Sequence, residues 1–365
     1  MRWGSWARAL EGAICINVLL SGMACDDDAK GGAPKPRDSG SNLDPTDAAV
    51  SDAAADGGDP SHVSWLPPIV KYPDAKSTET FRLSQTGLYR DLAAKELAPD
   101  LIEYEPEYKL WSDGAEKRRW LRLPPGTAID SSDMDHWVFP VGTMFFKEFS
   151  LAGKRLETRL IARLGPKPDD YFMGAFVWNE DETDAVFERE GESNVRGTEH
   201  DVPETKRCFT CHNGDKGRAL GYSAVQQPAA KALLSDPPSE PYVVPGDDVA
   251  RQALGYLHAN CGNCHNPNGT SRTDTNLTLR LEVSEHSVED TGIYKSGVRV
   301  DLDHWMHKGF KLRIAPGDSG ASAVLARMKS RIKDDAMPPF ASELVDETGV
   351  ELVEKWIDSL PKAGD

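Results

Sequence analysis

Alternating apolar and polar side chains predict strands in the middle of the chain. Between Lys154 and Leu164, every second side chain is apolar or Thr, and most of the side chains between them are charged. This period of two is typical of a strand that has one face toward solvent. Gly, Pro, Asp and Asn separate several such runs, so we expect an antiparallel sheet or sandwich over residues 75–200. The other predicted strands are 81–83, 119–123, 137–149 and 171–178.

Apolar side chains at helical spacing mark the last third of the chain. A helix that Asp247 or Asp248 caps is predicted over residues 247–260. A closing amphipathic helix is predicted over 344–360, and a helix is also expected near 88–97. The buried stripe of the first of these helices is expected to comprise Val249, Ala253, Tyr256 and Leu257.

The first 24 residues have the layout of an export signal. A basic start is followed by a short apolar stretch and by small residues before Cys25. This layout resembles a bacterial lipoprotein signal, in which the Cys after the cleavage point is lipidated, so it predicts a lipid anchor at Cys25. Cleavage after Ala24 that leaves Cys25 as a spare thiol is the alternative. Residues 25–64 have almost no large apolar side chain and predict a disordered acidic tether.

These patterns together predict an α+β multidomain protein. A β-sandwich-like antiparallel domain is expected over residues 65–235, and a mainly α-helical domain over residues 236–365. The chain has 365 residues, which at about 150 residues per domain allows two domains and a short extra segment.

Charge and hydropathy exclude some classes of function. The chain has 59 Asp and Glu against 42 Lys and Arg, a net charge of −17 and a mean hydropathy of −0.51. No stretch reaches the roughly 20 apolar residues that a membrane-spanning helix needs. Nucleic-acid binding is disfavoured because an acidic chain repels phosphate. We expect an exported protein of the cell envelope, periplasmic or surface-exposed, whose partners are small or present a basic face.

Two short motifs carry the predicted chemistry. Residues 208–212 and 261–265 each match the CxxCH pattern of covalent haem attachment. Thiols at positions i and i+3 lie on one face of a helical turn, so both can reach the vinyl groups of one porphyrin. The following His then supplies the proximal iron ligand. Two covalently attached haem c groups are therefore predicted, held by Cys208, Cys211, His212, Cys261, Cys264 and His265.

Zinc and redox-active disulfides are the alternatives for the four cysteines. The two pairs are more widely spaced than those of a zinc ribbon, and no thioredoxin-like βαβ pattern surrounds them. Neither alternative explains a His directly after both pairs. Cys15 would leave with the signal, so no cysteine would remain for a structural disulfide.

The surroundings of the first motif leave its chemistry open. Only 48 residues separate the two motifs, and this interval contains no Met. The distal iron ligand could be absent or come from a small set of residues further along. Lys147 shares its parity with Phe145 and Phe149, so it is either a snorkelling lysine at a sheet edge or a lysine aimed at a cofactor. The candidate distal ligands are His258, His304, Met306 and His307.

The last third resembles the C-terminal cytochrome c-like modules of exported bacterial proteins. A helix leads into CxxCH, a PGD turn precedes a helix at 315–328, and an MPP loop at 337–339 precedes the closing helix. The resemblance implies that Met337 is the distal ligand of the second haem. A buried core Met is the alternative.

Residues 100–360 as a whole resemble a family of uncharacterised bacterial dihaem c-type cytochromes. The resemblance lies in LWSDGAEKRRWLRLPPG, FPVGTMFFKEFSL, RLETRLIARL, FVWNEDETDA and the segments around both motifs. The run FPVGTMFFKEF before a CxxCH motif is also similar to cytochrome P460-like proteins, in which a lysine can crosslink to the porphyrin. That likeness implies that Lys147 is the corresponding lysine.

The sequence therefore favours a lipid-anchored dihaem cytochrome c that transfers single electrons. The alternative is an oxidoreductase whose first haem has an open coordination position and whose second haem relays electrons. A surface lipoprotein whose β domain binds a polymer or a protein is a third, non-redox possibility.

Overall fold

A computed structural model of the chain describes residues 68, 70–74, 77–227, 229–305 and 308–362. The predicted signal, Cys25 and the tether lie outside these residues. Among the described residues, no helix has the length and apolar character needed to cross a bilayer.

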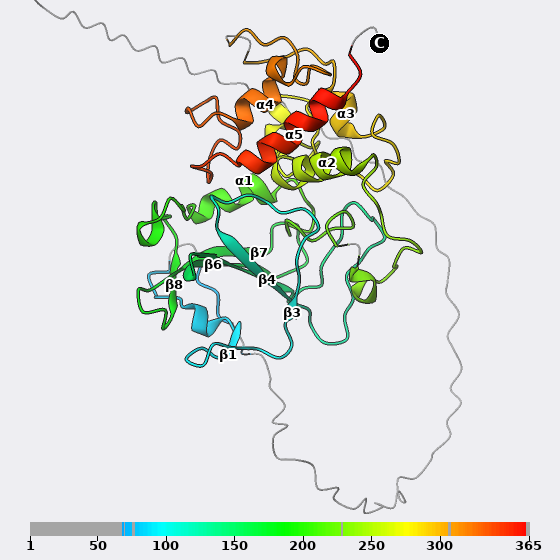
Figure 1. The fold of residues 1–365 in the computed structure, drawn as a ribbon. Coiled ribbons are helices and arrows are strands. Elements are labelled where there is room, and N and C mark those ends of the chain that lie inside the picture. The colour runs from blue at the N-terminus through cyan, green and yellow to red at the C-terminus, as the bar shows by residue number, and fades with distance from the viewer. Residues whose placement is uncertain (1–67, 69, 75–76, 228, 306–307, 363–365) are drawn as a thin grey trace, which may run out of the picture. The chain divides into compact units, whose positions relative to one another are not determined.

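The strands form one six-stranded antiparallel sheet and a separate two-stranded sheet (Figure 1). The six strands pair in chain order, so each strand neighbours the next one along the sequence. The small sheet pairs β1 (Tyr89–Asp91) with β2 (Glu96–Leu97). The large sheet comprises β3 (Ile102–Glu103), β4 (Glu116–Arg122), β5 (Met144–Leu151), β6 (Lys154–Arg163), β7 (Tyr171–Trp178) and β8 (Ala185–Glu188).

One face of the large sheet packs on the N-terminal part of the described chain. Trp120, Phe146 and Leu160 are paired across three neighbouring strands and are almost fully buried. They pack in one cluster with Leu83 and Leu88, which precede the large sheet in sequence. Opposed residues on adjacent strands share a face, so this pairing fixes the other set of side chains on the opposite face.

We call the opposite face of the large sheet the cavity face. It is defined by three rows of opposed residues on β4, β5 and β6. The rows are Leu121, Phe145 and Ile161; Arg119, Lys147 and Arg159; and Lys117, Phe149 and Glu157. The expectation that this side of β6 faces solvent is wrong, because Glu157 is fully buried. The sheet-edge interpretation of Lys147 is also wrong, because β5 lies between β4 and β6.

The helix expected near residues 88–97 is replaced by the hairpin β1–β2. Leu88 and Tyr89 are buried on the sheet, and the Ala98 amide donates to the Leu88 carbonyl at 3.0 Å. Lys95 has a φ of 57°, which ends any helical path at the turn. Burial of Leu88 and Tyr89 thus outweighs the local helical spacing. The strand expected at 81–83 is reduced to one bridge between Arg82 and Val186.

The helices begin and end close to the predicted positions. Asp247 caps α2 by accepting a bond from the Ala250 amide at 2.9 Å, and Asp346 caps α5 in the same way. The α-helices are α1 (Cys208–His212), α2 (Asp248–Asn260), α3 (Gly292–Gly297), α4 (Ala323–Met328) and α5 (Glu347–Ser359). The 3-10 helices that lie wholly within the described residues are Leu83–Gln85, Val195–Gly197, Thr205–Arg207, Ala230–Leu233, Thr270–Thr273 and Ser319–Ala321.

Helices α2 and α5 lie side by side and share a core (Figure 1). Ala253 and Leu257 of α2 are buried with Val353 and Trp356 of α5, as their spacing predicts. The prediction that Val249 belongs to the buried stripe is wrong, because its side chain is exposed. The predicted mixed α+β class with antiparallel strands is confirmed.

Candidate functional site

The first CxxCH motif forms the single turn α1. The His212 Nδ1–H donates to the Arg218 carbonyl at 2.6 Å, and a carbonyl can only accept, so the proton of the neutral ring lies on Nδ1. Burial lowers the pKa of His212 to about 4, which keeps the ring neutral near pH 7. The other ring nitrogen therefore has a free lone pair, as a metal ligand requires.

A large cavity lies between this turn and the cavity face of the sheet. Cys208, Cys211 and His212 line it, together with Lys147 and Arg159. The empty space, open solvent at its mouth included, is about 1480 Å³. Most of its other walls are apolar, including Phe145, Ile161, Met173, Ala175 and Phe340. A mostly apolar cavity with a few polar groups suits a flat, apolar cofactor that carries charged substituents.

The second CxxCH motif follows the end of α2 directly. The His265 amide donates to the Cys261 carbonyl at 2.9 Å, which continues the helical turn through the motif. Burial lowers the pKa of His265 to about 4. Its Nδ1 is buried and makes no hydrogen bond of normal geometry within the described residues. The nearby Leu277 backbone raises the pKa of His265, but burial outweighs this effect. This ring is thus also neutral near pH 7.

A second cavity brings together the two residues predicted as ligands of the second haem. His265 and Met337 both line this space of about 1240 Å³, which also includes open solvent. The Met337 amide donates to the carbonyl of Arg327, in the last turn of α4, at 3.0 Å. Further along, Asp113 accepts bonds from the Glu343 and Leu344 amides at 2.9 and 2.8 Å. These bonds fasten both ends of the Met337 loop.

The two motifs lie against each other. The Thr270 hydroxyl donates to the Thr210 carbonyl at 3.1 Å, and a Cβ added at Gly214 would overlap the Asn263 carbonyl oxygen. The hydrogen bond between the Cys211 and Cys264 thiols lowers the pKa of Cys264 to about 7 and raises the pKa of Cys211.

The two cavities also adjoin. Asn260, Cys264, Pro338 and Pro339 line both of them. The loop that begins at Met337 therefore borders the space next to the first motif as well as its own.

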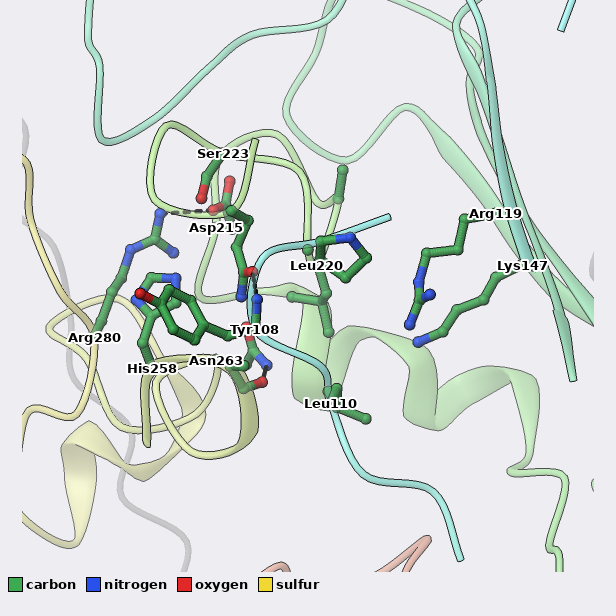
Figure 2. A pocket seen from close by; sticks show the side chains of 15 residues that line it. Tyr108, Leu110, Arg119, Lys147, Asp215, Leu220, Ser223, His258, Asn263 and Arg280 are labelled. Atoms are coloured by element: carbon green, nitrogen blue, oxygen red, sulfur yellow. Dashed lines mark hydrogen bonds and ion pairs between the residues drawn. The ribbon is translucent and has the colours of Figure 1, made fainter. Parts of the chain in front are cut away.

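A smaller polar cavity lies beside the first one (Figure 2). The Arg119 and Lys147 side chains reach into it from the sheet with their cationic ends close together. On its far side Arg280 donates to Asp215 at 2.7 Å, and both residues are buried. Lys147 lines this cavity and also the cavity of the first motif.

The candidate distal ligands of the first haem do not gather at its motif. His258 Nδ1 accepts from the Leu281 amide at 3.0 Å, and its side chain lines the polar cavity. His304 lines the cavity of the second motif. Met306 and His307 lie outside the described residues.

Sequence reasoning missed a buried His–Glu–Arg cluster at the first cavity. His200 is 3% exposed, and its Nε2 lies 2.7 Å from Glu157, which Arg159 also contacts at 2.6 Å. Burial raises the pKa of Glu157, but Arg159 and His200 outweigh this effect and lower it to about 2. His200 Nδ1 is buried without a partner among the described residues. No motif marks His200 in the sequence, because its partner Glu157 lies 43 residues earlier in the chain and only the fold brings the two together.

Comparison with protein-family models, with curated proteins and with solved structures finds no match to the chain. The family resemblance therefore stays a prediction, and any proposal about function rests on the residues around the two motifs.

Proposed function

We propose that the chain is an exported, lipid-anchored dihaem c-type cytochrome that carries out single-electron transfer. The observation that supports this most directly is the contact between the two CxxCH motifs, each of which borders its own large cavity. One function that needs two adjacent cofactors explains both the repetition of the motif and its close packing.

The residues of both motifs suit covalent haem. Each motif offers two thiols and a neutral imidazole to one cavity. Cys208 and Cys211 would attach the first haem and Cys261 and Cys264 the second, with His212 and His265 as proximal ligands. Met337 would be the distal ligand of the second haem, because it lines the same cavity as His265. Each bound haem would supply an iron that alternates between the ferric and ferrous states.

Contacts within the last third of the chain support the proposal that this part folds as a cytochrome c-like module. Helix α2 leads into the second motif and packs on the closing helix α5. Asp318 of the PGD turn caps the 3-10 turn that precedes α4, by accepting from the Ala321 amide at 3.1 Å. The β-rich part would then supply the wall of the first haem site in the manner of a separate sandwich-like domain.

Charge and the N-terminal sequence support the partner and the location. A net charge of −17 favours a redox partner with a basic face, and their association would weaken as salt rises. Residues 1–24 would direct export, and a lipid on Cys25 would hold the protein at the membrane of the cell envelope.

The experiment that tests this proposal counts covalent haems. The full chain is co-expressed with a c-haem maturation system, and its intact mass is measured under denaturing conditions. We expect two haems in the wild type and one in each double variant, Cys208→Ala/Cys211→Ala or Cys261→Ala/Cys264→Ala. A wild type without covalent haem would contradict the proposal.

An oxidoreductase with an open first haem is the second candidate. The buried His200–Glu157 pair favours it, because a histidine held by a carboxylate at a haem cavity can move a proton to or from a bound small molecule. Visible spectra of the reduced protein separate the two functions. Carbon monoxide binding to the first haem supports the enzyme, and its absence supports simple electron transfer.

A further inference from the structure

We infer that buried Arg119 and half-buried Lys147 form a carboxylate-binding site that receives the propionates of the first haem. This inference rests on the proposed function, and it assigns a role to two cations that the haem-attachment motifs leave unexplained.

The strand register brings these cations together. Arg119, Lys147 and Arg159 are directly opposed across β4, β5 and β6, so three positive side chains form one row on the cavity face. Opposed like charges repel, and the repulsion strengthens where water is excluded. Anions beside the row, or loss of the Lys147 proton, relieve this repulsion.

One of the three cations has its anion within the chain. Arg159 contacts Glu157 through two hydrogen bonds, of 2.9 and 2.6 Å. The nearby buried acid Asp215 is already paired with Arg280 at 2.7 Å.

The other two cations form no ion pair among the described residues, although Glu157 attracts Lys147 and Glu105 attracts Arg119 from further away. Lys147 makes no hydrogen bond or ion pair there, and its ammonium lies 5.1 Å from the centre of the Phe149 ring. Arg119 is buried and donates only one long bond, of 3.4 Å, to the Lys117 carbonyl. Burial and the neighbouring cations lower the pKa of Lys147 well below its ordinary value, as expected for an amine that lacks an anion. Buried Arg119 and protonated, half-buried Lys147 would therefore be stabilised by negative charge from outside the chain.

The position of Lys147 identifies the source of that charge. Its side chain lines both the cavity of Cys208, Cys211 and His212 and the polar cavity that Arg119 lines (Figure 2). A haem attached at the first motif would bring two propionate carboxylates into this region. Charged hydrogen bonds from Lys and Arg are the strong partners of a carboxylate.

The test uses the haem-loaded full chain and four variants. Lys147→Met removes the charge, Lys147→Arg keeps it, and Lys154→Met removes an exposed lysine from the start of β6 as a matched control. Intact mass first gives the number of haems in each protein. A potentiometric titration then gives the two reduction potentials, and the Met337→Ala variant identifies the potential of the second haem.

A nearby cation favours the ferrous state, which carries less positive charge. We expect Lys147→Met to shift the reduction equilibrium of the first haem at least tenfold toward the ferric state, which is about 59 mV for one electron. The second haem, Lys147→Arg and Lys154→Met should keep the wild-type potentials. Loss of the first haem in Lys147→Met that Lys147→Arg restores would also support the site.

Three results would overturn the inference. The first is a two-haem Lys147→Met protein with unchanged potentials. The second is an equal shift in Lys147→Arg, which would show that charge is not the cause. The third is a change in the spectrum of the first haem on adding nitrite to the wild type but not to Lys147→Met, which would make the pair a site for free anions. A wild type with no haem would instead refute the proposed function.

Discussion

The Cys264 thiol lies 3.8 Å from the Thr210 carbonyl oxygen, so the second CxxCH motif touches the backbone of the first. The two residues are 54 positions apart, and the two turns place their His side chains in different cavities, whereas Cys264 lines both. Haems attached to such turns would be neighbours, because each porphyrin is bonded to the sulfurs of its own turn. Electron exchange between them would then need no intervening protein element.

Close packing of the motifs predicts that Gly214 tolerates no side chain. A Cβ at this position would overlap the Asn263 oxygen, which is a backbone atom and cannot rotate away. We expect Gly214→Ala to lower the free energy of unfolding of the haem-loaded protein by about 1–3 kcal/mol. The measurement is denaturant-induced unfolding. Gly320→Ala is the control, because its added Cβ would meet nothing closer than an Asp318 oxygen at 3.5 Å. Equal stability of both variants would contradict the packing.

Loss of Met337 should change the second haem alone. Replacing the thioether ligand with Ala should lower the reduction potential of this haem and open it to carbon monoxide, because methionine ligation raises the potential. Met328→Ala is the matched control, since Met328 is buried and lines the same cavity. Potentiometry measures the reduction potential, and spectra of the reduced protein with carbon monoxide show whether the second haem binds it. An unchanged potential in Met337→Ala would give the ligand role to another residue of this cavity.

The ion pair between fully buried Glu157 and partly exposed Arg159 makes stability depend on pH. The folded-state pKa of Glu157 is about 2, below its ordinary value of 4.5, so ionised Glu157 stabilises the fold above about pH 4.5. This contribution falls as the pH drops toward 2. We expect Glu157→Gln to cost about 1–3 kcal/mol at pH 7, because Arg159 and buried His200 lose the carboxylate that both contact. The difference between variant and wild type should shrink steadily below pH 4.5.

A surface pair provides the control for this prediction. Glu103 and Arg118 also form two hydrogen bonds, both of 3.0 Å, but both side chains are about half exposed. Glu103→Gln should change stability by less than about 1 kcal/mol. Denaturant-induced unfolding of the wild type and of both variants, at pH 7 and at pH 3, gives the loss of stability for each variant at each pH. Similar losses in the two variants at pH 7 would show that burial of Glu157 contributes nothing.

Local signals predicted the parts of the site that local chemistry determines. The CxxCH motifs, the cap at Asp247 and the strand at 154–163 depend on residues close in sequence, and all lie where they were expected. The helix expected near 88–97 was wrong because burial on the sheet decided its conformation. The charged row on β4–β6 was missed because it depends on strand register. His200 was missed because only the fold brings it to Glu157.

The lipid anchor makes a prediction that is independent of the haems. If Cys25 is lipidated, Cys25→Ser should move the exported protein from the membrane fraction to the soluble fraction without changing its haem count. A single acyl chain binds membranes only marginally, so stable retention in the wild type would indicate more than one chain. Cys15→Ser is the matched control, because this cysteine lies within the predicted signal and would be removed on export. Fractionation followed by intact mass of the mature protein provides the measurement. A Cys25→Ser protein that stays in the membrane fraction would show that another part of the chain, or a bound partner, holds it there.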